Sequence, residues 1–415
     1  MSARALTHLP IPGGPAGLDA FLPALRAALA GEGPALALTP LESTPSQPGQ
    51  RLLAALAPGE PLESGDVALV IGTSGSTGHP RGVLLTAELL RRSAAVSLAR
   101  IGGPGRWVVA LPLHHIGGVM TLVRSIEAGL DPVADASLGG VTRFEPAAFV
   151  EVTADALAQS KADGARLYTS LVPTQLARLS SHAEGLRALA AYDAVLAGAA
   201  ATPPDLLSLL RESGVNVVVS YGMTETCGGC VYDGVPLDGV EISLAEVTDD
   251  VGRIVVGGSI VAPGYRRDPD LTREFFRTDG FRTGDRGRFG PGDVLDVLGR
   301  LDDIVQIGGE GVSVAAVEDA VRSVDGVADV VVVAVDDAEW GSRLFAYVTS
   351  DVAERSADRI DEARLIEEVR LHVAGSLGRR AVPEVIVLDA FPLLAAGKVD
   401  RAALRESATA SNASR

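Results

Sequence analysis

The sequence predicts an α/β protein: a large N-terminal domain of parallel βαβ sheets with a short-stranded antiparallel subdomain, then a small α+β C-terminal domain. Three observations predict this architecture. The chain has 415 residues, which is too long for one small domain and suits two or three. Hydrophobic residues make up 47% and charged residues 21%, so a large core is available and wholesale disorder is excluded. Strand and helix patterns alternate from residue 66 to residue 220, and short strands with Gly/Pro turns follow.

The alternation opens with a buried strand at residues 66–71. A Gly/Ser/Thr loop follows, and a helix begins near Thr86 with Glu88 in its first turn. Strands and helices are then expected in turn at residues 106–111, 118–128, 166–169, 173–181, 193–196, 204–213 and 215–220. Alternation of this kind builds βαβ units and therefore a parallel sheet.

The later part of the chain follows a different pattern. Short strands over residues 239–298 indicate an antiparallel subdomain. A domain boundary is expected near residues 299–303, which gives one domain over 1–301 and another over 302–415. In the second domain, strands and helices are expected at residues 303–307, 314–324, 327–335, 343–349, 360–374 and 384–388. The tail from Ser407 onward is small and polar, and is expected to fray.

Composition limits the possible partners. The chain has 36 basic and 53 acidic residues and a net charge of −17, which argues against nucleic acid and anionic membranes as partners. No apolar run approaches the ~20 residues of a membrane span, and no signal peptide is recognised, so we expect a cytoplasmic protein with no membrane insertion. Two cysteines exclude a disulfide framework. Lys161 and Lys398 are the only lysines, so a lysine within a motif suggests a specific need for a compact charge.

The strongest motif is the loop at residues 72–82, which reads GTSGSTGHPRG. Its glycines allow backbone N–H groups to converge on an anion, its hydroxyls donate further hydrogen bonds, and Arg81 adds positive charge. The loop lacks the patterns of a Walker A loop, a dinucleotide fingerprint and a nucleophile elbow. It therefore predicts a phosphate-binding loop rather than a plain surface loop. The expected phosphate contacts are Thr73, Ser74, Gly75, Ser76, Thr77, Gly78 and Arg81.

This loop resembles the signature of the adenylate-forming enzymes, a superfamily that includes acyl-CoA synthetases, luciferases and peptide-synthetase adenylation domains. Four later segments resemble motifs of the superfamily in the same order: YGMTET at 221–226, FRTGD at 281–285, GRLDD at 299–303 and PLLAAGKVDR at 392–401. The resemblance implies a ligase that uses ATP, Mg²⁺ and coenzyme A to convert a small-molecule carboxylate first to an acyl-adenylate and then to a thioester. It also implies that the C-terminal domain is mobile.

The resemblance assigns roles in the first domain. It places the Thr224 hydroxyl on the α-phosphate, and it places Mg²⁺ on Glu225, whose carboxylate is the hard oxygen donor that this ion prefers. Read alone, Glu225 would be a solvated surface acid. Further nucleotide contacts are implied for Gly198, Ala199, Tyr221, Gly222 and Met223.

Other roles fall in later segments. Asp285 is implied to accept hydrogen bonds from both ribose hydroxyls, with Arg300 near the ribose and phosphate. Read alone, Asp285 would be a turn residue and Arg300 half of a surface ion pair. Lys398 is implied to lie between the substrate carboxylate and the α-phosphate, where two anions approach each other. Asp302 is implied to be the hinge about which the C-terminal domain rotates. This rotation withdraws Lys398 from the site and presents instead a face of the domain that bears Gly309, where the lack of a side chain admits the CoA arm.

Two pairs of residues invite other interpretations. Adjacent residues of an extended chain point in opposite directions, so we do not expect His114 and His115 to share a metal. The resemblance implies that His115 gates the acyl pocket; a half-buried structural histidine is the alternative. No aspartate lies nearby to hold an α-amine, which favours a carboxylate without one. Cys227 and Cys230 are expected to be small core or pocket residues rather than a redox pair.

Within the superfamily, softer motifs favour one branch. The short segment before the phosphate loop and the motifs SLVPTQ at 170–175 and IGGE at 307–310 most resemble 2-succinylbenzoate–CoA ligases of the actinobacterial type, which act in menaquinone synthesis. Arg81 departs from the commoner lysine. Arg124 is a weak candidate for the second carboxylate of such a substrate, and a helix-surface ion pair is the favoured interpretation. Another aryl- or acyl-CoA ligase, a stand-alone adenylation domain and a non-catalytic nucleotide sensor stay open. A homodimer is possible, since dimers are common among such enzymes.

Overall fold

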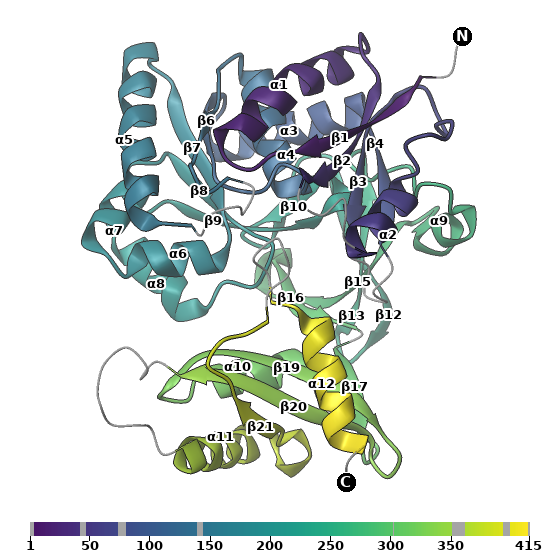
Figure 1. Ribbon diagram of the computed structural model, residues 1–415, viewed down its shortest axis with the longest axis vertical. Helices are drawn as coiled ribbons and strands as arrows, with labels where there is room; N and C mark the ends of the chain where they lie inside the picture. The colour runs from purple at the N-terminus through teal and green to yellow at the C-terminus, as the bar shows by residue number, and fades with distance from the viewer. Residues whose placement is uncertain are drawn as a thin grey trace. The chain divides into compact units, whose positions relative to one another are not determined.

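The computed structural model describes residues 4–41, 47–73, 80–138, 144–301, 303–350, 362–392 and 399–413. The chain divides into two compact units (Figure 1). The first comprises Met1–Thr283 and Gly287–Val297, and the second Gly284–Arg286 and Leu298–Arg415. Each unit encloses its own apolar core.

The first unit begins with a four-stranded sheet in the order β1-β2-β3-β4. Its strands are β1 (Leu6–Ile11), β2 (Ala35–Pro40), β3 (Val67–Thr73) and β4 (Arg81–Thr86). The first three are parallel, and β4 is antiparallel to β3. The associated helices are α1 (Pro15–Ala30), α2 (Gln47–Leu56) and α3 (Ala87–Ile101).

The predicted start of a helix near Thr86 is confirmed, and the Thr86 hydroxyl caps α3 by accepting a hydrogen bond from Leu89 N at 3.1 Å. The predicted order of strand, loop and helix around residues 72–82 is wrong. Strand β4 intervenes before α3, so the loop joins two antiparallel strands. The run Gly82–Leu85 is apolar and too short to reveal whether it continues into the helix or forms a strand.

A second sheet of seven strands has the order β11-β10-β9-β8-β7-β5-β6. Its strands are β5 (Gly105–Val109), β6 (Val133–Ala134), β7 (Arg166–Leu171), β8 (Ala194–Ala197), β9 (Val217–Met223), β10 (Gly228–Tyr232) and β11 (Val235–Pro236). Its helices are α4 (Ile116–Ala128), α5 (Pro146–Asp163), α6 (Pro173–Ser180), α7 (Ala183–Ala190) and α8 (Pro204–Glu212). Strands β5 to β9 are parallel, which confirms the prediction from the alternating pattern.

Helices cover both faces of this sheet (Figure 1). Alternate residues of β5, β7 and β8 point to opposite faces: Val108 and Val195 pack with α5 to α8, whereas Trp107 and Leu196 pack with α3. Burial on both faces explains why these strands are nearly continuous apolar runs.

The predicted antiparallel subdomain is also present. It consists of β12 (Val240–Thr248), β13 (Val251–Gly258), β14 (Phe276–Arg277), β15 (Gly280–Phe289) and β16 (Leu295–Arg300), with α9 at Pro269–Phe275. The order is β12-β13-β15-β14, and β16 pairs with β15.

The second unit has the predicted α+β composition. Its strands are β17 (Ile304–Ile307), β18 (Glu310–Ser313), β19 (Val327–Asp337), β20 (Gly341–Ser350) and β21 (Glu384–Val387). Its helices are α10 (Val314–Arg322), α11 (Glu362–Leu377) and α12 (Arg401–Ala413). The expectation of a frayed tail is wrong for α12, because Leu404 and Ala408 are buried against the sheet at 3% and 0% exposure.

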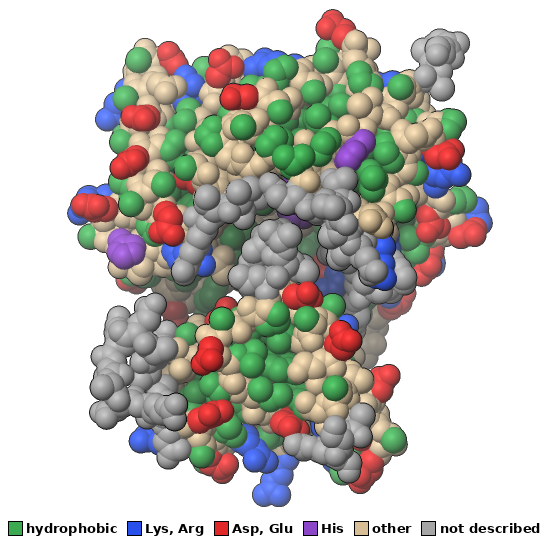
Figure 2. Space-filling view, viewed as in Figure 1, with side chains coloured by type: hydrophobic (Ala, Val, Ile, Leu, Met, Phe, Trp, Pro, Cys, Tyr) green, Lys and Arg blue, Asp and Glu red, His purple; other side chains and the backbone are tan. Residues whose placement is uncertain are grey.

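Acidic side chains are scattered over the face in Figure 2 rather than gathered in one patch. Among the described residues, no helix is long and apolar enough to cross a membrane.

Candidate active site

The order of strands in the seven-stranded sheet locates a candidate crevice. From β5 the chain runs to β6 on one side, and it then returns to β7 on the other side. In open α/β sheets, ligands bind outside the carboxyl ends of the strands at such a switch point. His115 follows β5, and residues 170–172 end and follow β7, so both segments border this crevice.

Gln175 connects the two sides of the crevice. Its side-chain amide donates to the carbonyl oxygen of Ala110 at 3.2 Å, and its Oε1 accepts from Val172 N at 3.0 Å. The residue is 9% exposed. Gln175 belongs to the motif SLVPTQ, but the sequence did not suggest a role for it.

The histidine pair differs from the prediction. The ring centroids of His114 and His115 lie 4.2 Å apart, so the two side chains do not point in opposite directions. His114 lies in a turn, and the backbone of His115 is extended where it precedes α4. No group of three or more His, Cys, Asp or Glu side chains suited to a metal occurs in the part of the chain that the structure describes.

The segment YGMTET bends sharply after β9. Tyr221, Gly222 and Met223 end the strand, and Thr224–Thr226 form a single 3₁₀ turn. A Cβ at Gly222 would lie 2.0 Å from the carbonyl oxygen of Gly228, so only glycine fits there.

The bend holds both predicted side chains in place. Met223 N donates to Thr226 Oγ1 at 3.0 Å, which closes the turn. Thr224 and Glu225 are each 8% exposed, so Glu225 is not the solvated surface acid of the alternative interpretation.

Glu225 has a neighbour that sequence reasoning missed. The Tyr265 hydroxyl donates to Glu225 Oε1 at 3.0 Å, and Arg81 Cζ lies 5.6 Å from the centroid of the Tyr265 ring. Burial, and secondarily the charge of Glu225, raise the pKa of Tyr265, while Arg81 opposes that rise. The hydroxyl therefore stays protonated and remains a donor. The turn-like sequence PGY gave no hint of this role, because the contact spans 40 residues.

Gly198 and Ala199 follow β8 at the same edge of the sheet. Gly198 N donates to the carbonyl oxygen of Leu171 at 3.2 Å, which ties the end of β8 to that of β7. Ala199 has a φ of 68°, in the left-handed region that residues with a Cβ rarely occupy. Such backbone strain clusters at functional sites.

The second unit brings together two predicted nucleotide residues. Arg300 Nη1 lies 3.5 Å from Asp285 Oδ1, and the Asp285 side chain is 15% exposed. The backbone holds the two strands together here, since Leu301 N donates to the Gly284 carbonyl oxygen at 2.7 Å. Arg300 is thus an ion-pair partner of the predicted ribose-binding carboxylate.

Gly309 lies in a tight turn. Gly308 and Gly309 have φ values of 59° and 84°, and they connect the antiparallel strands β17 and β18 rather than a strand and a helix. A Cβ at Gly308 would lie 2.8 Å from Arg380 Nη1, whereas none of the described atoms lies within 4 Å of a Cβ at Gly309. Arg380 itself lies over the Trp340 ring at 4.3 Å, a contact that the sequence did not suggest.

Several predicted residues lie outside the described part of the chain. They are Ser74, Gly75, Ser76, Thr77, Gly78, Asp302 and Lys398. The two described contacts of the phosphate loop, Thr73 and Arg81, are register partners where β3 and β4 meet it.

The favoured interpretation of Arg124 as half of a surface ion pair is wrong. The residue is 3% exposed, its Cζ lies 5.0 Å from the Trp107 ring centroid, and Nη2 donates to the Tyr232 hydroxyl at 3.3 Å. Its buried Nε has no hydrogen-bond partner among the described residues. Arg124 therefore belongs to the core between α3, α4 and the sheet.

The two cysteines are core residues, as expected. Cys227 and Cys230 are both 0% exposed, and the described structure holds no disulfide between them. Burial raises the pKa of the Cys227 thiol to about 12, which removes the thiolate that a redox pair requires.

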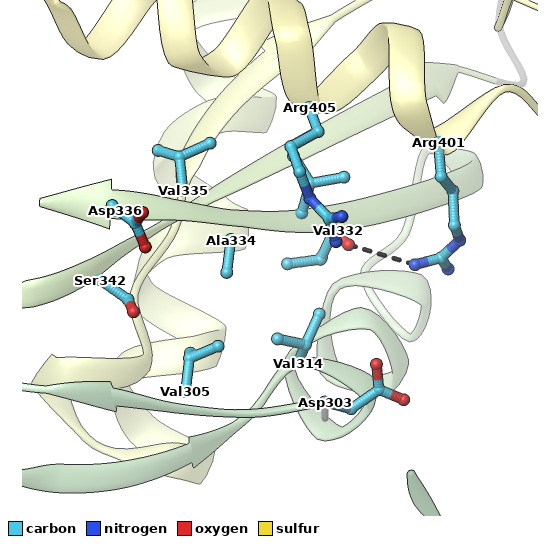
Figure 3. Close-up of a pocket in the computed structure, with 11 residues that line it drawn as sticks. Asp303, Val305, Val314, Val332, Ala334, Val335, Asp336, Ser342, Arg401 and Arg405 are labelled. Atoms are coloured by element: carbon cyan, nitrogen blue, oxygen red, sulfur yellow. Dashed lines mark hydrogen bonds between the residues drawn. The ribbon is translucent and has the colours of Figure 1, made fainter. Parts of the chain in front are cut away.

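A cavity of about 140 Å³ lies wholly within the second unit (Figure 3). Valine side chains of the sheet line it, together with Asp303, Asp336, Arg401 and Arg405. Arg401 is already engaged with Glu318 at 2.6 Å. None of the predicted site residues that the structure describes lines this cavity.

Comparisons with known proteins identify the family of this chain. Residues 24–266 match the family described as AMP-binding enzyme, and residues 316–398 match the AMP-binding enzyme C-terminal domain. The chain is 40% identical to a probable 2-succinylbenzoate–CoA ligase of Mycobacterium tuberculosis, over 92% of this chain and 94% of the relative.

Solved structures of similar fold include the o-succinylbenzoate CoA synthetase of Bacillus subtilis. Its complex with the acyl-adenylate intermediate is 25% identical to this chain with a TM-score of 0.76, and the similarity covers 97% of this chain and 89% of that one. Its complex with ATP and magnesium ion is 25% identical with a TM-score of 0.74, covering 98% and 89%.

Proposed function

This chain belongs to the AMP-binding enzyme family, and from that membership we propose that it is an ATP-dependent carboxylate–CoA ligase. The proposed reaction converts 2-succinylbenzoate, ATP and CoA to 2-succinylbenzoyl-CoA, AMP and diphosphate, a step of menaquinone biosynthesis. One observation carries the proposal: the similarity to the M. tuberculosis ligase extends over 92% of the chain. The fold of the B. subtilis acyl-adenylate complex supports it.

In the first step, a carboxylate oxygen of the substrate attacks the α-phosphorus of ATP, and diphosphate leaves. Thr224 donates to the α-phosphate, and the phosphate loop with Arg81 holds the leaving group. The donors present fit Mg²⁺, because this ion is commonly held by one or two protein carboxylates plus substrate phosphates, and Glu225 supplies a buried carboxylate. Bound there, Mg²⁺ would neutralise charge on the phosphate oxygens.

Lys398 and Asp285 complete the first step in this proposal. Lys398 supplies a positive charge where the carboxylate and the α-phosphate converge, and the energetic benefit is greatest in the transition state. Asp285 accepts from the ribose hydroxyls, and the neighbouring Arg300, whose Nη1 lies 3.5 Å from Asp285 Oδ1, helps to orient the carboxylate.

In the second step, the CoA thiol attacks the acyl carbonyl carbon and AMP leaves. Residues 302–415 turn about Asp302, which withdraws Lys398 and brings in the Gly308–Gly309 turn. The open surroundings of Gly309 suit the close approach of a pantetheine arm.

His115 is proposed to gate the acyl pocket at the switch point between β5 and β7. The proposal assigns no residue to the second carboxylate of the substrate, because Arg124 is 3% exposed and lies beside Trp107. Cytoplasmic location and homodimerisation also stay proposals; light scattering of the purified chain tests the second.

Carboxylate-dependent diphosphate release tests the function. 2-Succinylbenzoate is expected to be the best substrate in a panel that includes benzoate and medium-chain fatty acids. Equal or faster release with those acids would refute the proposed substrate but not the family membership. Release in the absence of any carboxylate would instead indicate an ATP hydrolase.

A further inference from the structure

Tyr265 lies where three distant segments of the first unit meet. Its hydroxyl donates to Glu225 Oε1 at 3.0 Å, and Arg81 Cζ lies 5.6 Å from its ring centroid. Tyr265 is 4% exposed. It thus contacts both the residue that leaves the phosphate loop and the carboxylate proposed to meet magnesium.

The backbone around Tyr265 is fixed to the neighbouring strand. Leu84 N donates to the Gly264 carbonyl oxygen at 3.1 Å, and Arg266 N donates to that of Gly82 at 2.7 Å. Tyr265 N donates to Thr272 Oγ1 at 2.9 Å. The segment that carries the tyrosine therefore cannot shift independently of β4.

The turn that carries Glu225 is held by the same segment. Ala262 N donates to the backbone carbonyl oxygen of Glu225 at 2.8 Å. The Tyr265 ring also packs edge-on against Phe276, with centroids 5.2 Å apart. Tyr265 and Glu225 are therefore both restrained by other contacts. The hydrogen bond between them consequently fixes the position of one carboxylate oxygen of Glu225.

We propose that Tyr265 is a positioning residue, whose hydroxyl orients the Glu225 carboxylate toward magnesium-bound ATP. The inference rests on the proposed function, and Tyr265 acts through Glu225 without touching the nucleotide. Magnesium demands near-ideal octahedral geometry, so a carboxylate free to rotate binds it less well than an oriented one.

The Tyr265 ring also gives a physical reason for an arginine instead of a lysine at position 81. A planar guanidinium can lie over an aromatic face, where a compact ammonium ion acts only as a point charge. Arg81 lies over both Tyr265 and Phe275, at 5.6 and 5.4 Å from their centroids. The exit of the phosphate loop is therefore linked through Tyr265 to Glu225.

Tyr265→Phe removes the hydroxyl and keeps the ring. In calorimetry, the variant should bind ATP with Mg²⁺ about tenfold more weakly than the wild type, the order expected for loss of a hydrogen bond to a charged group. Its affinity for AMP without Mg²⁺ should stay within about twofold. The Mg²⁺ concentration that half-saturates diphosphate release should rise by a similar factor.

Tyr232→Phe is the matched control. Its hydroxyl is equally buried and bonds Ser97 Oγ at 2.7 Å, but its ring lies in the core beside Arg124. This variant should lower the unfolding temperature as much as Tyr265→Phe and leave the ratio of Mg²⁺–ATP affinity to AMP affinity unchanged. Similar unfolding temperatures establish that both variants fold.

A double variant separates positioning from general stability. Because Tyr265 acts through the carboxylate, adding Tyr265→Phe to Glu225→Gln should weaken Mg²⁺–ATP binding by less than about twofold. The inference, but not the proposed function, would be overturned if Tyr265→Phe left the ratio of Mg²⁺–ATP affinity to AMP affinity unchanged. It would also be overturned if Tyr265→Phe weakened Mg²⁺–ATP binding as much in the Glu225→Gln background as in the wild type. If the ATP affinity of the wild-type protein were the same with and without Mg²⁺, both the proposed function and this inference would be overturned.

Discussion

At the scale of single residues, the Asp285 carboxylate is the predicted acceptor of the ribose hydroxyls. It is 15% exposed and lies 3.5 Å from Arg300 Nη1. The two oxygens of a carboxylate can accept hydrogen bonds from two hydroxyls. The sequence identified both residues by their motifs. Their pairing became visible only with the structure, because it depends on β15 and β16 lying side by side.

Replacing Asp285 with Ala should weaken the binding of ATP and AMP alike, since both carry the ribose. The loss should be at most about 1.5–3 kcal/mol per charge-assisted bond, and calorimetry with each nucleotide measures it. Asp296→Ala is the control, because Asp296 forms an exposed ion pair with Arg288 on the same sheet. Normal AMP binding by Asp285→Ala would mean that the ribose role is wrong.

Lys398→Ala should slow acyl-adenylate formation by about 10²–10³, the usual cost of one lost electrostatic contact to a transition state. Thioester formation from synthetic acyl-AMP and CoA should proceed near the wild-type rate. Single-turnover assays of each half-reaction measure the two rates.

The chain provides its own control for this experiment. Lys161→Ala changes the only other lysine, on the exposed last turn of α5, and should alter neither half-reaction. If Lys398→Ala slowed both half-reactions equally, Lys398 would be a structural residue.

At the scale of elements, α12 corrects the expectation of a frayed tail. Its small residues looked unable to bury much surface, but Ala408 is 0% exposed in a cluster with valines of β19. Small size was therefore a packing feature that the sequence alone could not distinguish from low complexity.

Ala408→Asp should destabilise the second unit by about 2–4 kcal/mol, because it buries an unpaired carboxylate. Ser407→Asp places the same group on the exposed face of α12 and should change stability by less than about 0.5 kcal/mol. Urea unfolding measures both. Equal free energies of unfolding for the two variants would show that α12 does not bury residue 408 against the sheet.

At the scale of the whole molecule, the two units have separate cores. The core of the second unit is formed by residues from Ile307 to Val385, and the largest core of the first by residues from Ile11 to Phe281. Separate cores permit relative motion of domains. The proposed boundary at residues 301–302 and the hinge at Asp302 stay predictions.

Asp302→Pro should spare acyl-adenylate formation and slow the thioester step, because a fixed φ favours a single domain orientation. The two half-reactions are assayed separately, with Asp302→Ala as the control that keeps backbone freedom. A proline variant with both half-reactions intact would contradict a hinge at this position.

The sequence by itself determined the α/β class, the parallel sheet and the family, and its motifs supplied the site residues that stay predictions. These depend on local period and on motifs that are contiguous in the chain, such as YGMTET and FRTGD. Tertiary structure alone decided that β4 intervenes after the phosphate loop, that Arg124 is buried against Trp107, and that Tyr265 meets Glu225. Each of these features depends on contacts between residues that are far apart in the sequence, and local sequence patterns do not reveal such contacts.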